Sequence, residues 1–147
     1  MLTYETRVRV RYAETDQMGV VYYANYLVWM EVARVEFCRS VGLNYKDMEV
    51  ADGVFLAVAE ARCRYLAPAR YDMEVCIQTS LEEAHPRMIR FGYAMREASN
   101  GRVLATGNTK HIFCGKDMRP VKLPEKYRAL FGIKAVYQST TEPSSAS

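Results

Sequence analysis

The sequence predicts an α+β domain in which an antiparallel five-stranded sheet wraps around one long central helix. One observation is a run of apolar residues at helical spacing between residues 25 and 41, which indicates a buried helix. Another is the alternation of apolar and polar residues through much of residues 55–114, interrupted by turn residues, which is typical of consecutive strands. A single strand precedes the helix, so the element order favours one sheet packed on one helix.

The predicted first strand ends at Tyr12 and carries arginines on one of its two faces. Its alternating residues are Tyr4, Thr6, Val8, Val10 and Tyr12 on one face, with Arg7, Arg9 and Arg11 on the other. We expect the arginine face to be solvated or to lie at a subunit edge.

The predicted helix runs from about Asn25 to Val41, with Asn25 as its N-cap and Gly42 as its C-cap residue. It carries two apolar stripes, formed by Tyr26, Met30, Ala33, Phe37 and Val41, and by Val28, Val32 and Val35. A helix that is apolar on more than one side is usually buried on more than one side.

Residues 43–54 are predicted to be a mixed connection that ends in a turn at Asp52-Gly53. Four strands follow, over residues 55–66, 73–81, 89–95 and 103–114, and a short helix over residues 124–131 begins with Pro124. The breaks between the strands contain the turn-forming residues Pro68, Pro86 and Gly101. In the first of these strands, one face is predicted to hold Phe55, Ala57, Ala59, Ala61, Cys63 and Tyr65, whose mostly small side chains would let a helix pack closely.

Length and composition limit the classes of protein to which the chain can belong. Its 147 residues suit one domain, which we expect to span residues 1–135, and the Ser/Thr-rich residues 136–147 are predicted to be a disordered tail. The net charge of +3 comes from dispersed Lys and Arg residues, which argues against nucleic acid as a partner. With no membrane-length apolar run and no signal-peptide pattern, we expect a soluble, cytoplasmic protein.

Cysteine and histidine patterns argue against metal or triad chemistry. The four cysteines form no CxxC pair and are expected to be buried free thiols, and neither His85 nor His111 has a metal-ligand spacing. We therefore expect no metal site, no cofactor and no Ser-His-Asp arrangement.

The candidate reactive group is Asp16, a lone carboxylate between the first strand and the long helix. A carboxylate just before a helix lies near free backbone N–H groups and the positive end of the helix dipole. Such a site can attack a carbonyl and stabilise the oxyanion that forms. The alternative is that Asp16 and Gly19 are ordinary turn residues.

The motif around Asp16 resembles that of a known family of enzymes. The run Tyr12-x-x-Thr-Asp16-x-x-Gly-Val-Val-Tyr-Tyr23-x-Asn-Tyr26 is similar to the hotdog-fold acyl-CoA thioesterases, in the branch of the YbgC-like and 4-hydroxybenzoyl-CoA thioesterases. A second segment, Tyr65-x-Ala-Pro-Ala-Arg-Tyr-Asp72, resembles the second strand and turn of that family. The resemblance extends over nearly the whole chain and implies a hotdog fold and thioester hydrolysis.

The resemblance also implies roles for individual residues. Asp16 matches the essential carboxylate, which acts as a nucleophile or as a general base on water. Tyr23 matches a residue whose backbone N–H, at the helix start, polarises the thioester carbonyl. YbgC-like members often have His at the position of Tyr23, a departure that bears on rate and substrate preference. Tyr12 either helps to position Asp16 or is a core residue at the end of a strand.

Binding residues are expected from two parts of the chain. Val21 and Tyr22, with Trp29 and residues 55–58, are apolar candidates to line an acyl pocket, although Trp29 also suits core packing. Arg87 and Arg90 follow the His85-Pro86 break, roughly where the family places a basic contact to the CoA nucleotide, and they too can be ordinary surface charges. The resemblance implies a pocket at a subunit interface, and we expect a homo-oligomer, either a dimer or a homotetramer built as a dimer of dimers.

Three functions therefore stay open at this point. The leading interpretation is an acyl-CoA thioesterase, and its relatives are an acyl carrier protein thioesterase and a non-catalytic acyl-CoA-binding protein. The retained Asp16 speaks against the last of these.

Overall fold

The computed structural model describes residues 2–133, which form one sheet, one long helix and several short helices. The elements in chain order are β1 (Thr3–Arg9), η1 (Tyr12–Glu14), α1 (Asn25–Ser40), α2 (Tyr45–Asp52), β2 (Phe55–Tyr65), β3 (Glu74–Ala84), β4 (Met88–Glu97), β5 (Val103–Cys114), α3 (Glu125–Arg128) and η2 (Ala129–Phe131). The predicted tail at residues 136–147 and the predicted domain end at residue 135 lie outside the described residues.

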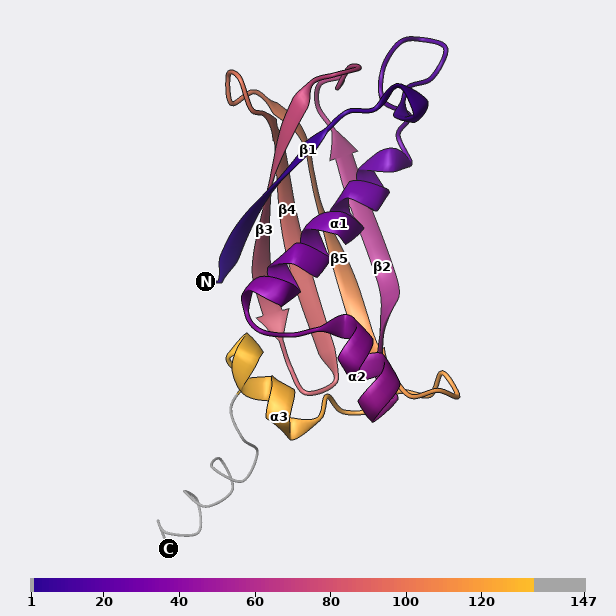
Figure 1. The fold of residues 1–147 in the computed structure, drawn as a ribbon, viewed down its shortest axis with the longest axis vertical. Coiled ribbons are helices and arrows are strands. Elements are labelled where there is room, and N and C mark those ends of the chain that lie inside the picture. The colour runs from indigo at the N-terminus through magenta and orange to yellow at the C-terminus, as the bar shows by residue number, and fades with distance from the viewer. Residues whose placement is uncertain (1, 134–147) are drawn as a thin grey trace, which may run out of the picture.

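All five strands join in one antiparallel sheet, in the order β1-β3-β4-β5-β2. The helix α1 runs across one face of this sheet, and the sheet curves around it (Figure 1). The α+β fold with a five-stranded antiparallel sheet around a central helix is thus confirmed. Among residues 2–133, β2 pairs only with β5, so its other side is an open edge of the described sheet.

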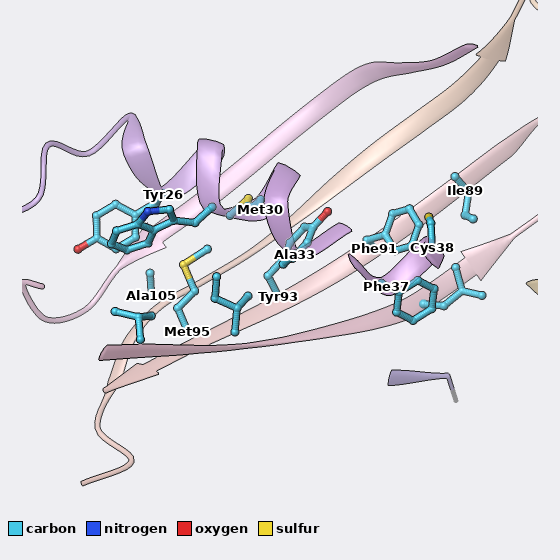
Figure 2. Packing of buried hydrophobic residues seen from close by; sticks show 14 of the residues in the cluster. Tyr26, Met30, Ala33, Phe37, Cys38, Ile89, Phe91, Tyr93, Met95 and Ala105 are labelled. Carbon is cyan, nitrogen blue, oxygen red and sulfur yellow. The ribbon is translucent and has the colours of Figure 1, made fainter. Parts of the chain in front are cut away.

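The core lies between α1 and the sheet. One predicted stripe of the helix is buried there, since Tyr26, Met30, Ala33 and Phe37 are almost inaccessible to solvent. Figure 2 shows these side chains facing the strand residues Ile89, Phe91, Tyr93, Met95 and Ala105. Because the removal of apolar surface from water is the main stabilising term in folding, this layer supplies much of the stability.

The second predicted stripe of α1 differs from the expectation. Val28 and Val32 are exposed in the single chain, and Val35 is half-buried. The sheet covers only one side of the helix, so Val28 and Val32 on the other side are left largely uncovered by residues 2–133.

The ends of β1 and α1 also differ from the predictions. β1 stops at Arg9, and Tyr12 lies in the 3-10 turn η1 with 77% of its surface exposed, so it is not a core residue at a strand end. Asn25 is the first residue of α1 rather than its N-cap, which is Ala24, because the Asn25 side chain donates to the Glu14 carbonyl instead. Val41 caps the other end, and Gly42 follows it with a positive φ of 99°.

The connection predicted at residues 43–54 contains a helix that the pattern did not indicate. In α2, Asn44 is the N-cap and accepts hydrogen bonds from the backbone N–H groups of Lys46 and Asp47, while Gly53 ends the helix in the left-handed conformation. Only Met48 of this helix is buried, so its apolar pattern is too sparse to show a helical period.

A bulge in β2 changes which side chains face the core. Ladder pairing shifts between Val58 and Glu60, so Ala59 has no partner on β5. Leu56 before the bulge and Cys63 after it both pack against the core, although an uninterrupted strand would place even and odd positions on opposite faces. The predicted face running from Phe55 to Tyr65 is therefore wrong for the residues before the bulge.

The remaining strands and turns match the predictions closely. The apolar positions of β3 and β4 are buried, and the turn before β5 contains Gly101 with a φ of +75°. The predicted short helix near the C-terminus is present as α3 and η2, with Pro124 at its N-cap position. The four cysteines are free thiols, of which Cys38 and Cys114 are buried and Cys63 and Cys76 are half-buried.

Candidate active site

The loop between η1 and α1 is a tight turn that presents Asp16. The Asp16 N–H donates to the Val20 carbonyl over 2.9 Å, and the Gly19 N–H donates to the Asp16 carbonyl over 2.9 Å. Gly19 adopts a φ of +78°, which side chains other than glycine rarely tolerate, so this turn needs its glycine. A bridge between Thr15 and Val21 closes the loop below the turn.

The Asp16 carboxylate is half-buried and only partly satisfied. Its Oδ1 accepts the Met18 N–H over 2.8 Å, which orients the side chain within its own turn. Its Oδ2 has no hydrogen-bond partner among residues 2–133. One carboxylate oxygen is therefore held while the other is available to a substrate or a water molecule.

The start of α1 offers an unpaired backbone donor. The N–H groups of Tyr22, Asn25, Tyr26 and Leu27 donate to backbone carbonyls, whereas within the described part of the chain the Tyr23 N–H has no backbone acceptor. This N–H lies two residues before the first helical residue, where the helix dipole is positive. Donors of this kind stabilise an oxyanion.

Tyr65 fixes the backbone next to this donor. Its hydroxyl donates to the Tyr23 carbonyl over 2.9 Å, linking the end of β2 to the start of α1. Partial burial, with a contribution from Cys63, raises the pKa of Tyr65 to about 12. The Tyr65 hydroxyl therefore stays protonated and keeps donating at neutral pH.

A pocket of about 370 Å³ joins these groups. Its walls are mostly aliphatic and aromatic, and its lining residues are Asp16, Met18, Val20, Val21, Tyr23, Tyr26, Tyr65, Leu66, Ala67 and Pro68. The carboxylate is thus placed at the side of an apolar cavity, an arrangement suited to an acyl group with one polar reacting centre.

Three of the predicted site residues meet at this pocket. Asp16, Val21 and Tyr23 line it together. Tyr22 lies beside it, with its ring centroid 4.7 Å from that of Tyr23. The Tyr23 hydroxyl raises the pKa of Tyr22, and the Asp16 charge contributes to the shift.

The other three predicted residues are not brought to the pocket within one chain. Tyr12 packs its ring edge-on against Tyr71, and its carbonyl accepts the Thr15 hydroxyl over 2.7 Å. Arg87 belongs to the turn between β3 and β4. This turn lies at the end of the sheet opposite the β1–α1 loop (Figure 1). Arg90 follows on β4 and pairs with Glu83, Nε to Oε1, over 3.0 Å.

Sequence reasoning did not identify two residues that shape this site. Tyr65 was assigned to a strand face, and its bond to Tyr23 depends on a contact between residues 42 positions apart. Glu14 is a charged residue in a loop motif, and only the structure shows that its carboxylate is buried. Trp29, a candidate for the pocket wall, is buried and donates its indole N–H to Glu14.

Two further kinds of feature are absent from residues 2–133, a metal-binding cluster and a membrane-spanning helix. Residues 2–133 contain no group of three His, Cys, Asp or Glu side chains arranged to hold a metal ion. None of the helices described in this range has both the length and the apolar character that crossing a membrane requires.

Comparison with known proteins assigns the family. The model of the thioesterase-like superfamily matches residues 10–131, so the chain belongs to this superfamily. YneP of Bacillus subtilis is 35% identical over 121 residues, which are 82% of this chain and 86% of YneP. The acyl-CoA thioesterase YbgC of Haemophilus influenzae is 29% identical over 124 residues, which are 84% of this chain and 90% of YbgC.

A solved structure extends the likeness to the whole fold. The DHNA-CoA thioesterase of Staphylococcus aureus is 28% identical and superposes with a TM-score of 0.86 over 98% of this chain and 96% of its own. The resemblance to hotdog-fold thioesterases that the Asp16 motif suggested is therefore confirmed.

Proposed function

We propose that this thioesterase hydrolyses acyl-CoA thioesters to a free carboxylic acid and CoA, with Asp16 as its reactive carboxylate. The observation that carries the proposal is one pocket lined by both Asp16 and Tyr23, whose carboxylate Oδ2 and backbone N–H have no hydrogen-bond partner among residues 2–133. The names of the YbgC and DHNA-CoA relatives support CoA as the carrier of the acyl group.

The Asp16 carboxylate can act by either of two routes. In the first, it attacks the thioester carbonyl carbon, the C–S bond breaks with release of the CoA thiolate, and water then opens the resulting mixed anhydride. In the second, it takes a proton from a water molecule that attacks the carbonyl directly. In both routes negative charge develops on the carbonyl oxygen, and the Tyr23 N–H is the proposed donor that stabilises it.

Substitution of Asp16 tests this role. Asp16→Asn keeps an oxygen for the Met18 N–H but removes the charge, so we expect kcat to fall by about 100- to 10,000-fold. Release of free thiol from a panel of aliphatic and aromatic acyl-CoA esters measures turnover and also identifies the preferred acyl group. Calorimetric titration with CoA should show that binding is retained.

Asp117→Asn is the matched control. Asp117 also accepts the N–H two residues ahead, from Arg119 over 3.1 Å, but it lies in an exposed turn away from the pocket. It should leave kcat unchanged. Thiol release by Asp16→Asn at the parental rate would show that Asp16 has no part in the mechanism. Preference for acyl carrier protein thioesters over CoA thioesters in a competition assay would show that the carrier is acyl carrier protein.

The proposed enzyme is a homo-oligomer in which a second subunit completes the pocket. Several apolar side chains at the pocket mouth are exposed in the single chain, namely Met18, Tyr23, Tyr65 and Leu66. Arg87 and Arg90 lie away from this mouth, so their proposed contact with CoA phosphates requires the pocket of a partner subunit. A dimer, or a dimer of dimers, meets both needs.

A further inference from the structure

Glu14 is a buried carboxylate that the reaction itself does not use. It is only 5% exposed, yet both of its oxygens are satisfied. Oε1 accepts the Arg11 N–H over 2.8 Å, and Oε2 accepts the Trp29 indole N–H over 2.9 Å. The Arg11 guanidinium lies 3.6 Å from Oε2. Burying a carboxylate is costly unless such donors replace its hydration, so these contacts are needed.

The backbone of the same residue makes two further contacts. The Glu14 carbonyl accepts the Tyr22 N–H over 2.9 Å and the Asn25 side-chain amide over 2.9 Å. Residue 14 thus connects the exit of β1, the returning arm of the loop and the first turns of α1. Asp16 lies between the two arms that these bonds hold together.

We propose that Glu14 is a positioning residue for thioester hydrolysis, which holds the Asp16 turn against the start of α1. It does not line the pocket and acts through the loop. Trp29 is its partner, because the indole N–H anchors the carboxylate to the helix that presents the Tyr23 N–H. This inference rests on the proposed catalytic role of Asp16.

Two substitutions test the contact between Glu14 and Trp29, one at each residue. In Glu14→Gln, an NH₂ group replaces one of the two carboxylate oxygens, so either the Arg11 N–H or the Trp29 indole N–H faces a donor instead of an acceptor. Trp29→Phe removes the indole N–H and keeps an aromatic ring in the core. A misplacement of about 1 Å can reduce catalysis by about 100-fold, so we expect kcat to fall 10- to 100-fold with KM changed less than about threefold.

A control separates positioning from general loss of stability. Tyr93→Phe also removes buried hydrogen bonds, those of the Tyr93 hydroxyl with Thr109 at 2.7 Å and with Arg34 at 3.3 Å, but Tyr93 forms no hydrogen bond with Glu14 or the loop. It should lower the melting temperature and leave kcat unchanged. In the double variant Glu14→Gln/Trp29→Phe, kcat should be no lower than in the less active of the two single variants. The reason is that both substitutions break the same contact between Glu14 and Trp29.

The outcomes distinguish this inference from the proposed function. If Asp16→Asn is inactive while Glu14→Gln and Trp29→Phe keep the parental kcat with lower melting temperatures, Glu14 is only structural and the inference fails alone. A parental kcat in Asp16→Asn overturns both. If Glu14→Gln does not fold, the kcat of Trp29→Phe decides whether the inference holds.

Discussion

At the scale of single residues, a polar chain crosses the apolar core. The buried Arg34 on α1 donates to the Tyr93 hydroxyl over 3.3 Å, Tyr93 pairs with Thr109 over 2.7 Å, and Thr109 pairs with His111 over 2.7 Å. The His111 ring packs edge-on against Phe91, and its Nδ1 has no partner among the described residues. Burial, reinforced by the Arg34 charge, lowers the pKa of His111 to about 3.

This shift predicts a contribution of His111 to the pH dependence of stability. The unfolded chain binds a proton at His111 below about pH 6.5, whereas the folded chain binds it only near pH 3. The stabilising effect of the neutral ring is therefore complete above pH 6.5 and is lost as pH falls toward 3, by up to about 1.4 kcal/mol per pH unit. Urea unfolding at a series of pH values should show that His111→Gln gains stability relative to the parent as pH falls.

His85→Gln is the control for this measurement, because its side chain is 60% exposed on the surface. The free energy of unfolding of His85→Gln should change with pH in the same way as that of the parent. Parallel curves for His111→Gln and the parent would show that His111 does not carry the effect.

At the scale of the elements, α1 and β5 approach closely at Gly107. A Cβ atom added there would collide with the Arg62 carbonyl oxygen on β2 and with the Met30 Cε on α1. The absence of a side chain at this point thus lets the helix lie close to the sheet. Because the Tyr23 N–H lies just before α1, the packing at Gly107 also influences how close the start of this helix lies to the sheet.

We predict that Gly107→Ala destabilises the fold by about 1–3 kcal/mol, because the backbone of β2 cannot move aside without breaking its ladder. The midpoint of chemical denaturation measures the effect. Gly92→Ala is the matched control, since the three atoms nearest to the added Cβ there all belong to the Glu82 side chain, whose exposed end can rotate away. Equal midpoints for the two variants would contradict the argument.

At the scale of the whole molecule, the single chain leaves apolar surface and an open strand edge uncovered. β2 forms one edge of the sheet, and Val58 on it is 55% exposed. On α1, Val28 and Val32 are also exposed. An unpaired edge of this kind invites pairing with another chain, which agrees with the proposed oligomer.

Val58→Lys is therefore expected to weaken self-association and, because a partner subunit is proposed to complete the pocket, to lower kcat/KM in parallel. Sedimentation velocity across a concentration series measures the first effect, and thiol release measures the second. Val50→Lys makes the same change at a residue that is 73% exposed on α2, outside the sheet, and should alter neither. A monomeric parent protein would refute the expectation at once.

Sequence pattern alone predicted most of the architecture. The strands β3, β4 and β5 and the buried stripe of α1 followed from side-chain periods, because burial on one face imposes those periods directly. The bulge at Ala59 and the helix α2 did not follow from the pattern. Each depends on pairing or capping geometry, to which an apolar pattern contributes little.

The residues of the candidate site also divide into those that the sequence predicted and those that only the structure revealed. Asp16, Gly19 and Tyr23 form one continuous motif, so their chemistry could be inferred before any fold was known. The place of Glu14, Trp29 and Tyr65 was decided only by tertiary structure. Their hydrogen bonds join residues that are 15 and 42 positions apart. The proposed role of Glu14 in holding the loop depends on the burial of its carboxylate. The sequence determined which groups are available for reaction, and the packing of α1 on the sheet decided which residues hold them in place.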